Sequence, residues 1–260
     1  MQVAEINGIH LHYSDMGHGA PVMLCNSLGT DMRLWDGVLG RLPDGLRIVR
    51  FDKRGHGLSD CPAAPYSMGS LISDAEALLD HLEIRKCLFV GCSIGGMIAQ
   101  GLAAKRPDLV RAAVLSNTAA KIGTREMWHD RVAAVEKGGV EALADAVMER
   151  WFTPAFRATP ELRAWRNMLT RTPADGYAGC SAAIAGTDFY TTTADLRLPV
   201  LGIAGDHDGS TPPDLVRETV ELIEGARFEI IRGAGHLPMV EQPEAFAALL
   251  NAFIEETGHV

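Results

Sequence analysis

The fold is decided by residues 88–99, which read LFVGCSIGGMIA. A short apolar run is followed by a glycine-rich turn with Ser93 at its apex, and then by apolar residues at helical spacing. A serine with Gly91 and Gly95 two positions to either side, at a strand-to-helix turn, is the pattern of a nucleophile elbow. The tight turn exposes the hydroxyl at a helix N-terminus, where the helix dipole favours developing negative charge. The stretch therefore predicts a nucleophilic serine at Ser93.

The composition is that of a single globular unit with a small-molecule partner. The chain has 260 residues and 47% of them are hydrophobic, which is enough to bury a large core. A formal net charge of −9 argues against nucleic-acid binding, which depends on clustered Lys and Arg. The five cysteines are odd in number and lie mostly in apolar runs, so we expect them to be reduced core residues.

We predict a cytoplasmic protein with no membrane span. The chain opens on MQVAE, which has neither the basic start nor the long apolar stretch of a secretory signal. The residues between Lys86 and Lys105 carry no charge over about the length of a membrane helix, but four glycines, a serine and a glutamine interrupt them. A strand, a turn and a helix explain this stretch better.

Around the elbow, strand and helix patterns alternate along the chain. The N-terminus predicts a β-hairpin, with Asn7-Gly8 suited to the turn between its arms. Apolar runs at 22–25, 47–51, 110–115, 199–204 and 227–231 predict further strands, and helices are expected around Trp35 and over 67–82, 213–224 and 243–254. This alternation indicates an α/β protein with a mainly parallel, doubly wound sheet, whose site lies at the carboxyl ends of the strands.

One segment interrupts the alternation. From about residue 119 to residue 195 the apolar residues follow a helical spacing, with prolines between the runs. We interpret this segment as a helical cap inserted on top of the sheet. The predicted domains are a core of residues 1–118 and 196–260 and a cap of residues 119–195.

A serine hydroxyl needs a base within hydrogen-bond reach, and that base needs an orienting acid. His236 lies on a glycine-lined turn after the last predicted strand, and Asp206 and Asp208 follow the strand before it. All three therefore belong at the same edge of the sheet as Ser93. Position alone does not choose between the two aspartates. No pair of the other histidines has the context of a zinc site, so no metal is expected.

These segments resemble the α/β-hydrolase family along nearly the whole chain, through GCSIG at 91–95, DKRGHGLS at 52–59, GDHD at 205–208 and GH at 235–236. Within that family, NSLGTD at 26–31 with Trp35, the Ser-Ile-Gly-Gly form of the elbow, AGTDF at 185–189 and GSTPP at 209–213 look like the 3-oxoadipate enol-lactonases.

The resemblance implies a catalytic triad of Ser93, Asp208 and His236. It also implies an oxyanion hole formed by the backbone amides of Leu28 and Ile94. The reaction it implies is the opening of the enol-lactone ring through an acyl-enzyme, as a step in aromatic-acid catabolism, with no cofactor. Two alternatives are another small-ester or lactone hydrolase, which includes cofactor-free haloperoxidase-like relatives, and a hydrolase-fold receptor that binds a small lactone.

Other residues carry weaker hypotheses. Arg33 is the cation nearest to the predicted oxyanion loop and could meet a substrate carboxylate. Trp128 and Trp151 in the cap are hypothesised to line the pocket. Cys92 is adjacent to the nucleophile position, but the flanking glycines bracket Ser93, so a packed core thiol is the better interpretation. His56 and Arg54 are expected to hold the structure together beside the site.

Overall fold

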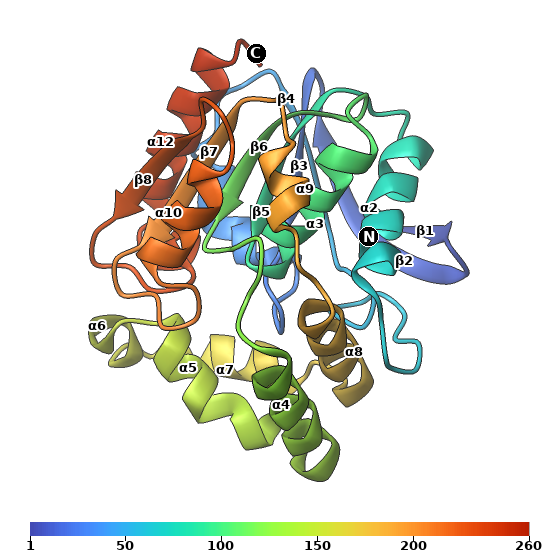
Figure 1. The fold of residues 1–260 in the computed structure, drawn as a ribbon, viewed down its shortest axis with the longest axis vertical. Helices are drawn as coiled ribbons and strands as arrows, with labels where there is room; N and C mark the ends of the chain where they lie inside the picture. Colours follow the sequence, from blue (N-terminus) through green and yellow to red (C-terminus); the bar gives the residue numbers. More distant parts are fainter. Residues whose placement is uncertain (260) are drawn as a thin grey trace.

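The computed structural model describes residues 1–259. Its centre is one eight-stranded sheet in the order β1-β2-β4-β3-β5-β6-β7-β8 (Figure 1). The strands are β1 (Gln2–Ile6), β2 (Ile9–Gly17), β3 (Ala20–Cys25), β4 (Leu46–Phe51), β5 (Cys87–Cys92), β6 (Val110–Ser116), β7 (Val200–Gly205) and β8 (Arg227–Ile231). All pairs from β4 to β8 are parallel, whereas β1 with β2 and β2 with β4 are antiparallel.

The predicted N-terminal hairpin is confirmed. Ile6 pairs with Ile9, and the two residues between them have positive φ angles, 49° at Asn7 and 76° at Gly8. A two-residue turn with both φ angles positive matches the twist of the strands that it joins, and Asn-Gly adopts it at low cost. The second arm then continues along β4, which joins the hairpin to the parallel part of the sheet.

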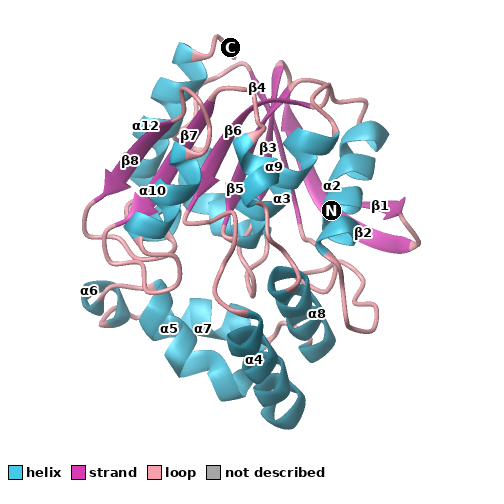
Figure 2. Ribbon diagram, in the orientation of Figure 1, coloured by secondary structure: helices cyan, strands magenta, loops and turns pink. Residues whose placement is uncertain are grey.

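Helices cover both faces of the sheet, as the cyan and magenta colouring of Figure 2 makes clear. α2, α3, α9 and α10 lie on the face toward the viewer, and α1 packs with α12 on the other face. The helices of this core are η1 (Met32–Trp35), α1 (Asp36–Leu39), α2 (Met68–His81), α3 (Ile94–Lys105), α9 (Tyr190–Ala194), α10 (Pro213–Glu221), α11 (Pro238–Glu241) and α12 (Pro243–Glu256).

The elbow strand and its helix lie at the centre of this layered structure. Every residue of β5 is buried, and so is every residue of α3 from Ile94 to Ala103. Buried strands with neighbours on both sides read as continuous apolar runs, which is why the sequence signal was strong here. The small residues of α3 let it pack closely against β5, β6 and α2.

A group of helices stands over the carboxyl-end edge of the sheet, below the arrowheads in Figure 1. They are α4 (Arg125–Gly138), η2 (Val140–Leu143), α5 (Ala144–Trp151), α6 (Pro154–Arg157), α7 (Leu162–Thr170) and α8 (Ala174–Ala185), and we call them the cap. The predicted insertion over 119–195 also contains α9, which packs against α3 in the core layer. The division into core and cap at residues 118 and 196 remains a prediction.

Two expected helices differ in detail. The helix expected around Trp35 is a 3₁₀ turn followed by a single α-helical turn, and the helix from Pro213 ends at Glu221 rather than Glu224. The 3₁₀ turn at the start of the first of these helices follows from Asp31, whose carboxylate accepts a hydrogen bond from the Arg33 amide and starts a tight turn. Within residues 1–259, no helix combines the length and apolarity that a membrane span requires.

Candidate active site

The turn after β5 has the strained geometry of a nucleophile elbow. Ser93 has φ 57° and ψ −118°, a combination that non-glycine residues rarely adopt. Its amide donates to the Ser116 carbonyl at 3.0 Å, and its carbonyl accepts from the Thr118 hydroxyl at 2.6 Å. These contacts hold the turn so that Ser93 stands at the start of α3, 7% exposed, in a cavity under the cap.

Both flanking glycines are required by close backbone approach. A Cβ at Gly91 would lie 2.2 Å from the Gly95 carbonyl oxygen, and a Cβ at Gly95 would lie 2.3 Å from the Cys25 carbonyl oxygen. Distances below 3.0 Å cannot be relieved here without moving backbone, because the opposing atoms belong to β3 and to the turn itself. The second contact also presses the elbow against the loop that follows β3.

We expect Gly95→Ala to lower the free energy of unfolding by at least about 2 kcal/mol, because the added methyl group must displace the end of β3. Chemical denaturation of wild type and variant measures the difference. Gly69→Ala is the matched control: Gly69 is exposed near the start of α2, and its added Cβ would meet only the Ser67 hydroxyl at 3.6 Å. An unchanged stability for Gly95→Ala would contradict the close packing of elbow and β3.

His236 and Asp208 meet beside Ser93. His236 follows β8 and Asp208 follows β7, and the register of these strands, with Gly205 opposite Ile231, brings the two loops together. His236 Nδ1 lies 2.9 Å from Asp208 Oδ2, and both side chains are buried. Asp206 lies elsewhere: its Oδ1 accepts hydrogen bonds from the amides of Gly233 and Ala234. Of the two aspartates, Asp208 is the one that orients the imidazole.

The Asp208 carboxylate is fully supplied with hydrogen bonds. Asn117 Nδ2 and Thr211 Oγ1 donate to Oδ2 at 2.9 and 2.8 Å, and the amides of Ser210 and Thr211 donate to Oδ1 at 2.7 and 3.0 Å. Burial opposes ionisation, but the nearby His236 and the hydrogen bonds outweigh it, so the pKa of Asp208 is lowered from its ordinary value. The site therefore holds an ionised carboxylate against the imidazole.

Two backbone amides next to Ser93 are free to bind an oxyanion. Within residues 1–259, neither the Leu28 amide nor the Ile94 amide has a hydrogen-bond acceptor. Ile94 is the first residue of α3, and Leu28 lies in the loop after β3, whose last residue, Cys25, pairs with Gly91 of β5. This register brings the loop that carries Leu28 next to the elbow, where the family resemblance predicts the oxyanion hole.

The loop that carries Leu28, residues 26–31, is held in place by buried polar side chains. His56 Nε2 accepts from the Gly29 amide at 2.9 Å, and burial lowers the pKa of His56 well below its ordinary value, so it stays neutral and can accept. Arg54 pairs with Asp74 at 2.6 Å. His56 and Arg54 therefore have the structural role expected of them.

The cavity at the triad has a volume of about 210 Å³. Its walls come from the loop after β3, from the elbow, from α4, α5 and α8 of the cap, and from the loops after β7 and β8. Trp128 and Trp151 both line it, as hypothesised. Ser27 is an unexpected member: its Oγ lies 3.4 Å from His236 Nε2, the ring nitrogen that faces the cavity.

Two arginines line this cavity that the sequence analysis did not identify as site residues. Arg131 on α4 stacks on the Trp128 ring at 4.5 Å, and Arg150 on α5 also lines the cavity. Neither forms an ion pair within residues 1–259. Burial and the neighbouring Arg131 lower the pKa of Arg150. Two unpaired cations in a small cavity are the expected environment for an anionic ligand.

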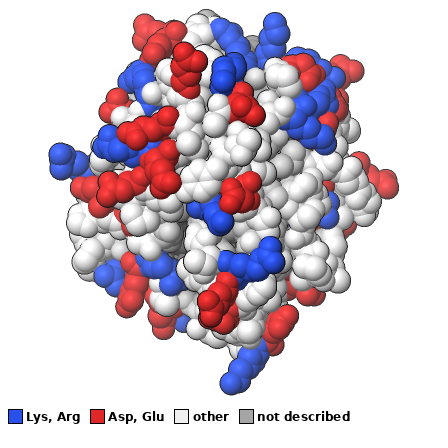
Figure 3. Space-filling model, in the orientation of Figure 1, with Lys and Arg blue, Asp and Glu red and all other residues white. Residues whose placement is uncertain are grey.

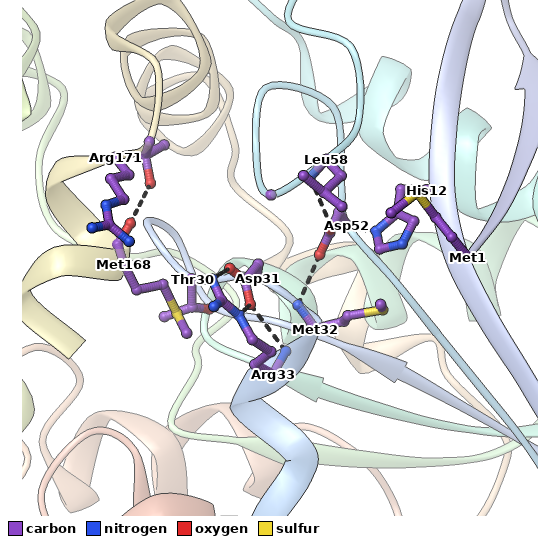
Figure 4. Close-up of a pocket in the computed structure, with 12 residues that line it drawn as sticks. Met1, His12, Thr30, Asp31, Met32, Arg33, Asp52, Leu58, Met168 and Arg171 are labelled. Carbon is purple, nitrogen blue, oxygen red and sulfur yellow. Dashed lines mark hydrogen bonds and ion pairs between the residues drawn. The ribbon is translucent and has the colours of Figure 1, made fainter. Parts of the chain in front are cut away.

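Arg33 lies outside the triad cavity, contrary to our hypothesis. It lines a separate cavity of about 490 Å³ between η1, the loop after β4 and α7, which contains none of the three triad residues (Figure 4). Its guanidinium pairs with Asp31, Nε to Oδ1 at 2.9 Å, and its side chain is 62% exposed. Sequence proximity to the oxyanion loop was misleading, because the Arg33 side chain pairs with Asp31 and lines a different cavity.

Cys92 is a core thiol. Its side chain is fully buried, and burial, followed by the nearby Asp208 carboxylate, raises its pKa well above the ordinary value. A thiol that stays protonated and inaccessible is not a nucleophile. Within residues 1–259, no three His, Cys, Asp or Glu side chains are grouped so as to hold a metal ion.

Comparison with known proteins agrees with this geometry. The profile of the alpha/beta hydrolase fold family matches residues 20–243. The chain belongs to the α/β-hydrolase family. It is 34% identical to 3-oxoadipate enol-lactonase 2 of Acinetobacter baylyi, over 95% of this chain and 94% of that protein.

Solved structures of other α/β hydrolases superpose closely on this one. The enol-lactonase from Burkholderia xenovorans has a TM-score of 0.94 and 35% identity, covering 98% of this chain and all of that one. A thermophilic esterase from Thermogutta terrifontis, solved with malate bound, also has a TM-score of 0.94, with 27% identity and complete coverage of both chains. The α/β-hydrolase fold expected from the sequence is thereby confirmed.

Sequence reasoning missed Ser27, Asn117, Thr211, Arg131 and Arg150. Of these residues in this α/β hydrolase, Thr211 could have been predicted from the sequence, because a threonine three residues after an aspartate in a loop can donate hydrogen bonds to the aspartate carboxylate. The arginines had none. An arginine on a cap helix looks the same in sequence whether it faces solvent or a cavity, and the cap helices carry many exposed charges of both signs.

Proposed function

We propose that this α/β hydrolase is a serine hydrolase that opens the ring of 3-oxoadipate enol-lactone to give 3-oxoadipate. The observation that carries the proposal is the pair of unpaired arginines, Arg131 and Arg150, in the cavity that contains Ser93 and His236. A small lactone with one carboxylate fits a 210 Å³ cavity with two cations and apolar walls. Two relatives of similar length that are called enol-lactonases support the same substrate.

In the proposed acylation step, His236 removes the proton from the Ser93 hydroxyl as its oxygen attacks the lactone carbonyl carbon. The amides of Leu28 and Ile94 donate hydrogen bonds to the oxygen that becomes negative. Asp208, ionised and hydrogen-bonded to Nδ1, stabilises the imidazolium that forms. The ring carbon–oxygen bond then breaks, and the His236 imidazolium gives its proton to the leaving oxygen, which departs as an enol and tautomerises to the ketone.

Deacylation repeats the same chemistry with water. His236 takes a proton from a water molecule, the resulting hydroxide attacks the acyl-enzyme carbonyl, and Ser93 leaves with the proton returned by the imidazolium. Ser27 Oγ, 3.4 Å from Nε2, lies beside the position that this water would occupy. No step needs a cofactor.

The arginine pair yields a prediction about charge selectivity. We expect Arg150→Met to lower kcat/KM for the anionic lactone by about 10- to 100-fold, the loss of a charged hydrogen bond, mainly through KM. The neutral ester p-nitrophenyl acetate, assayed in parallel, is expected to change by less than about threefold. Arg131→Met, which removes the other arginine of the cavity, is the matched variant. An equal loss with both substrates would contradict recognition of the carboxylate.

The proposed substrate is tested by steady-state kinetics on wild type. We expect kcat/KM for 3-oxoadipate enol-lactone to exceed that for p-nitrophenyl acetate by at least about 10³-fold, because the carboxylate contacts position the ring. A lactone rate no higher than the ester rate would rule out the specific substrate and leave a general small-ester hydrolase, as the esterase relative suggests. Absence of hydrolysis with both would favour a receptor instead.

A further inference from the structure

A lysine is buried beneath the loop that carries the Leu28 amide. Lys53 follows β4, and its side chain is 1% exposed. Its Nζ donates to the Ser27 carbonyl oxygen at 2.6 Å and lies 3.4 Å from the Thr30 carbonyl oxygen. The lysine therefore contacts residues 26–31 without lining the catalytic cavity.

The Ser27 carbonyl belongs to the same peptide group as the Leu28 amide. In a trans peptide the C=O and the N–H point in opposite directions, so a donor on the oxygen lies directly behind the amide hydrogen. This oxygen accepts three hydrogen bonds, from Lys53 Nζ, from Thr30 Oγ1 at 2.9 Å and from the Thr30 amide at 3.3 Å. Hydrogen bonds at one end of a peptide polarise it and strengthen the donor at the other end.

Stability alone does not explain a charged residue here. Within residues 1–259, Lys53 forms no ion pair at hydrogen-bond distance, and burying an ammonium group without a close counter-ion costs several kcal/mol. Neutral donors already tie this loop: Asn26 Nδ2 donates to the Thr30 carbonyl at 3.0 Å. A neutral or apolar side chain at position 53 would serve packing better than a lysine does.

We propose that Lys53 is a positioning residue that holds the Ser27–Leu28 peptide with its N–H toward Ser93, and whose positive charge stabilises the oxyanion formed there. The inference rests on the proposed acyl transfer at Ser93, because Lys53 acts only through the Leu28 amide. It touches neither the substrate nor His236. The lysine makes the oxyanion hole more positive without entering the cavity.

The groups that surround Lys53 influence the pH at which its amine loses a proton. Facing it are Cys25 of β3, Cys180 of α8, His56, and the carboxylates of Asp31 and Asp52. Burial is the largest influence and lowers the pKa of Lys53, while the carboxylates of Asp52 and Asp31 oppose the effect. The same burial raises the pKa of both thiols to about 12 and lowers that of His56, so none of the three changes charge between pH 7 and 10.5.

The first test is Lys53→Met, with an ester substrate that wild type hydrolyses. We expect kcat to fall about 10- to 100-fold with KM within about twofold, because the interaction exists only when the oxyanion forms. The melting temperature is expected to be unchanged or higher, since an apolar residue of similar length replaces a buried charge. Lys105→Met, which removes an exposed lysine paired with Glu76 at the far end of α3, is the matched control and should behave as wild type.

End-point titration with a fluorophosphonate counts competent active sites, so that a misfolded fraction of the variant does not distort kcat. An unchanged kcat for Lys53→Met, or a loss confined to KM, would overturn the inference. Loss of activity in Ser93→Ala with an unchanged Lys53→Met would leave the proposed function intact. Activity that persists in Ser93→Ala would instead remove the proposed function and the inference together.

The second test separates charge from anchoring within the wild-type protein. A neutral lysine amine still donates a hydrogen bond to the Ser27 carbonyl, so deprotonation removes the charge and keeps the contact. We expect wild-type kcat to fall as pH rises through a pKa below 10.5, the ordinary value for lysine, and Lys53→Met to lack this alkaline fall. A wild-type profile that is flat to pH 10.5, or the same fall in both proteins, would show that the charge plays no part.

Discussion

Ser93→Ala is expected to lower kcat for both lactone and ester hydrolysis by about 10⁴- to 10⁶-fold, with KM changed by less than about threefold. In the proposed mechanism the Ser93 hydroxyl bonds to the substrate carbon, whereas Ser27 Oγ, 3.4 Å from His236 Nε2, belongs to the loop after β3 and not to the elbow. The cavity walls, the arginines and the amides remain, so binding is retained. The small residual rate would come from water attacking within a preformed oxyanion hole.

Two controls make this result specific. Removing one oxygen from a 7% exposed side chain should leave the melting temperature within about 2 °C, which shows that the fold is intact. Cys92→Ala should retain nearly all activity, because that thiol is buried and protonated. A hydrolysis rate that persists in Ser93→Ala and disappears in Cys92→Ala would assign the nucleophile to the thiol and refute our assignment.

Asp208→Asn is expected to reduce kcat by about 10⁴-fold. An asparagine at this position can present its NH₂ group to Nδ1, which stabilises the imidazole tautomer with the proton on Nε2 and prevents that nitrogen from accepting the serine proton. It also removes the charge that stabilises the imidazolium. Single-turnover measurements should show that the acylation step itself is slowed.

The neighbouring Asp206→Asn is the natural control for this variant. Asp206 accepts from the Gly233 and Ala234 amides and does not reach the imidazole. We expect its kcat within about threefold of wild type and a loss of about 1 kcal/mol in the free energy of unfolding. If Asp206→Asn lost activity as severely as Asp208→Asn, the geometry of the two loops described above would be wrong.

The surface of the molecule agrees with a small-molecule partner. On the face shown in Figure 3, basic and acidic side chains are interspersed over the core layer and the cap, and no basic patch of the kind that binds nucleic acid gathers there. The unpaired positive charge of Arg131 and Arg150 lies inside the cavity instead.

Local chemistry made much of this protein predictable from its sequence. The Asn7-Gly8 turn, the apolar run of β5 and the glycines around Ser93 each specify a backbone conformation within a few residues, because steric limits on φ and ψ act locally. The carboxyl ends of parallel strands lie at one edge of the sheet whatever the details of packing. Ser93 and His236 could therefore be assigned to one site although they lie 143 residues apart in the sequence.

Position along the chain left Asp206 and Asp208 open until the family resemblance chose Asp208, whereas the surroundings of Arg33, Arg131, Arg150 and Lys53 were decided by tertiary structure alone. Each depends on where a side chain points once several loops have packed together, and a rotation of one residue along a loop or helix exchanges cavity for solvent. Lys53 illustrates this most clearly. In sequence it is one charge in a polar loop, and only the packing of β3, β4 and α8 around it turns that charge toward the oxyanion hole.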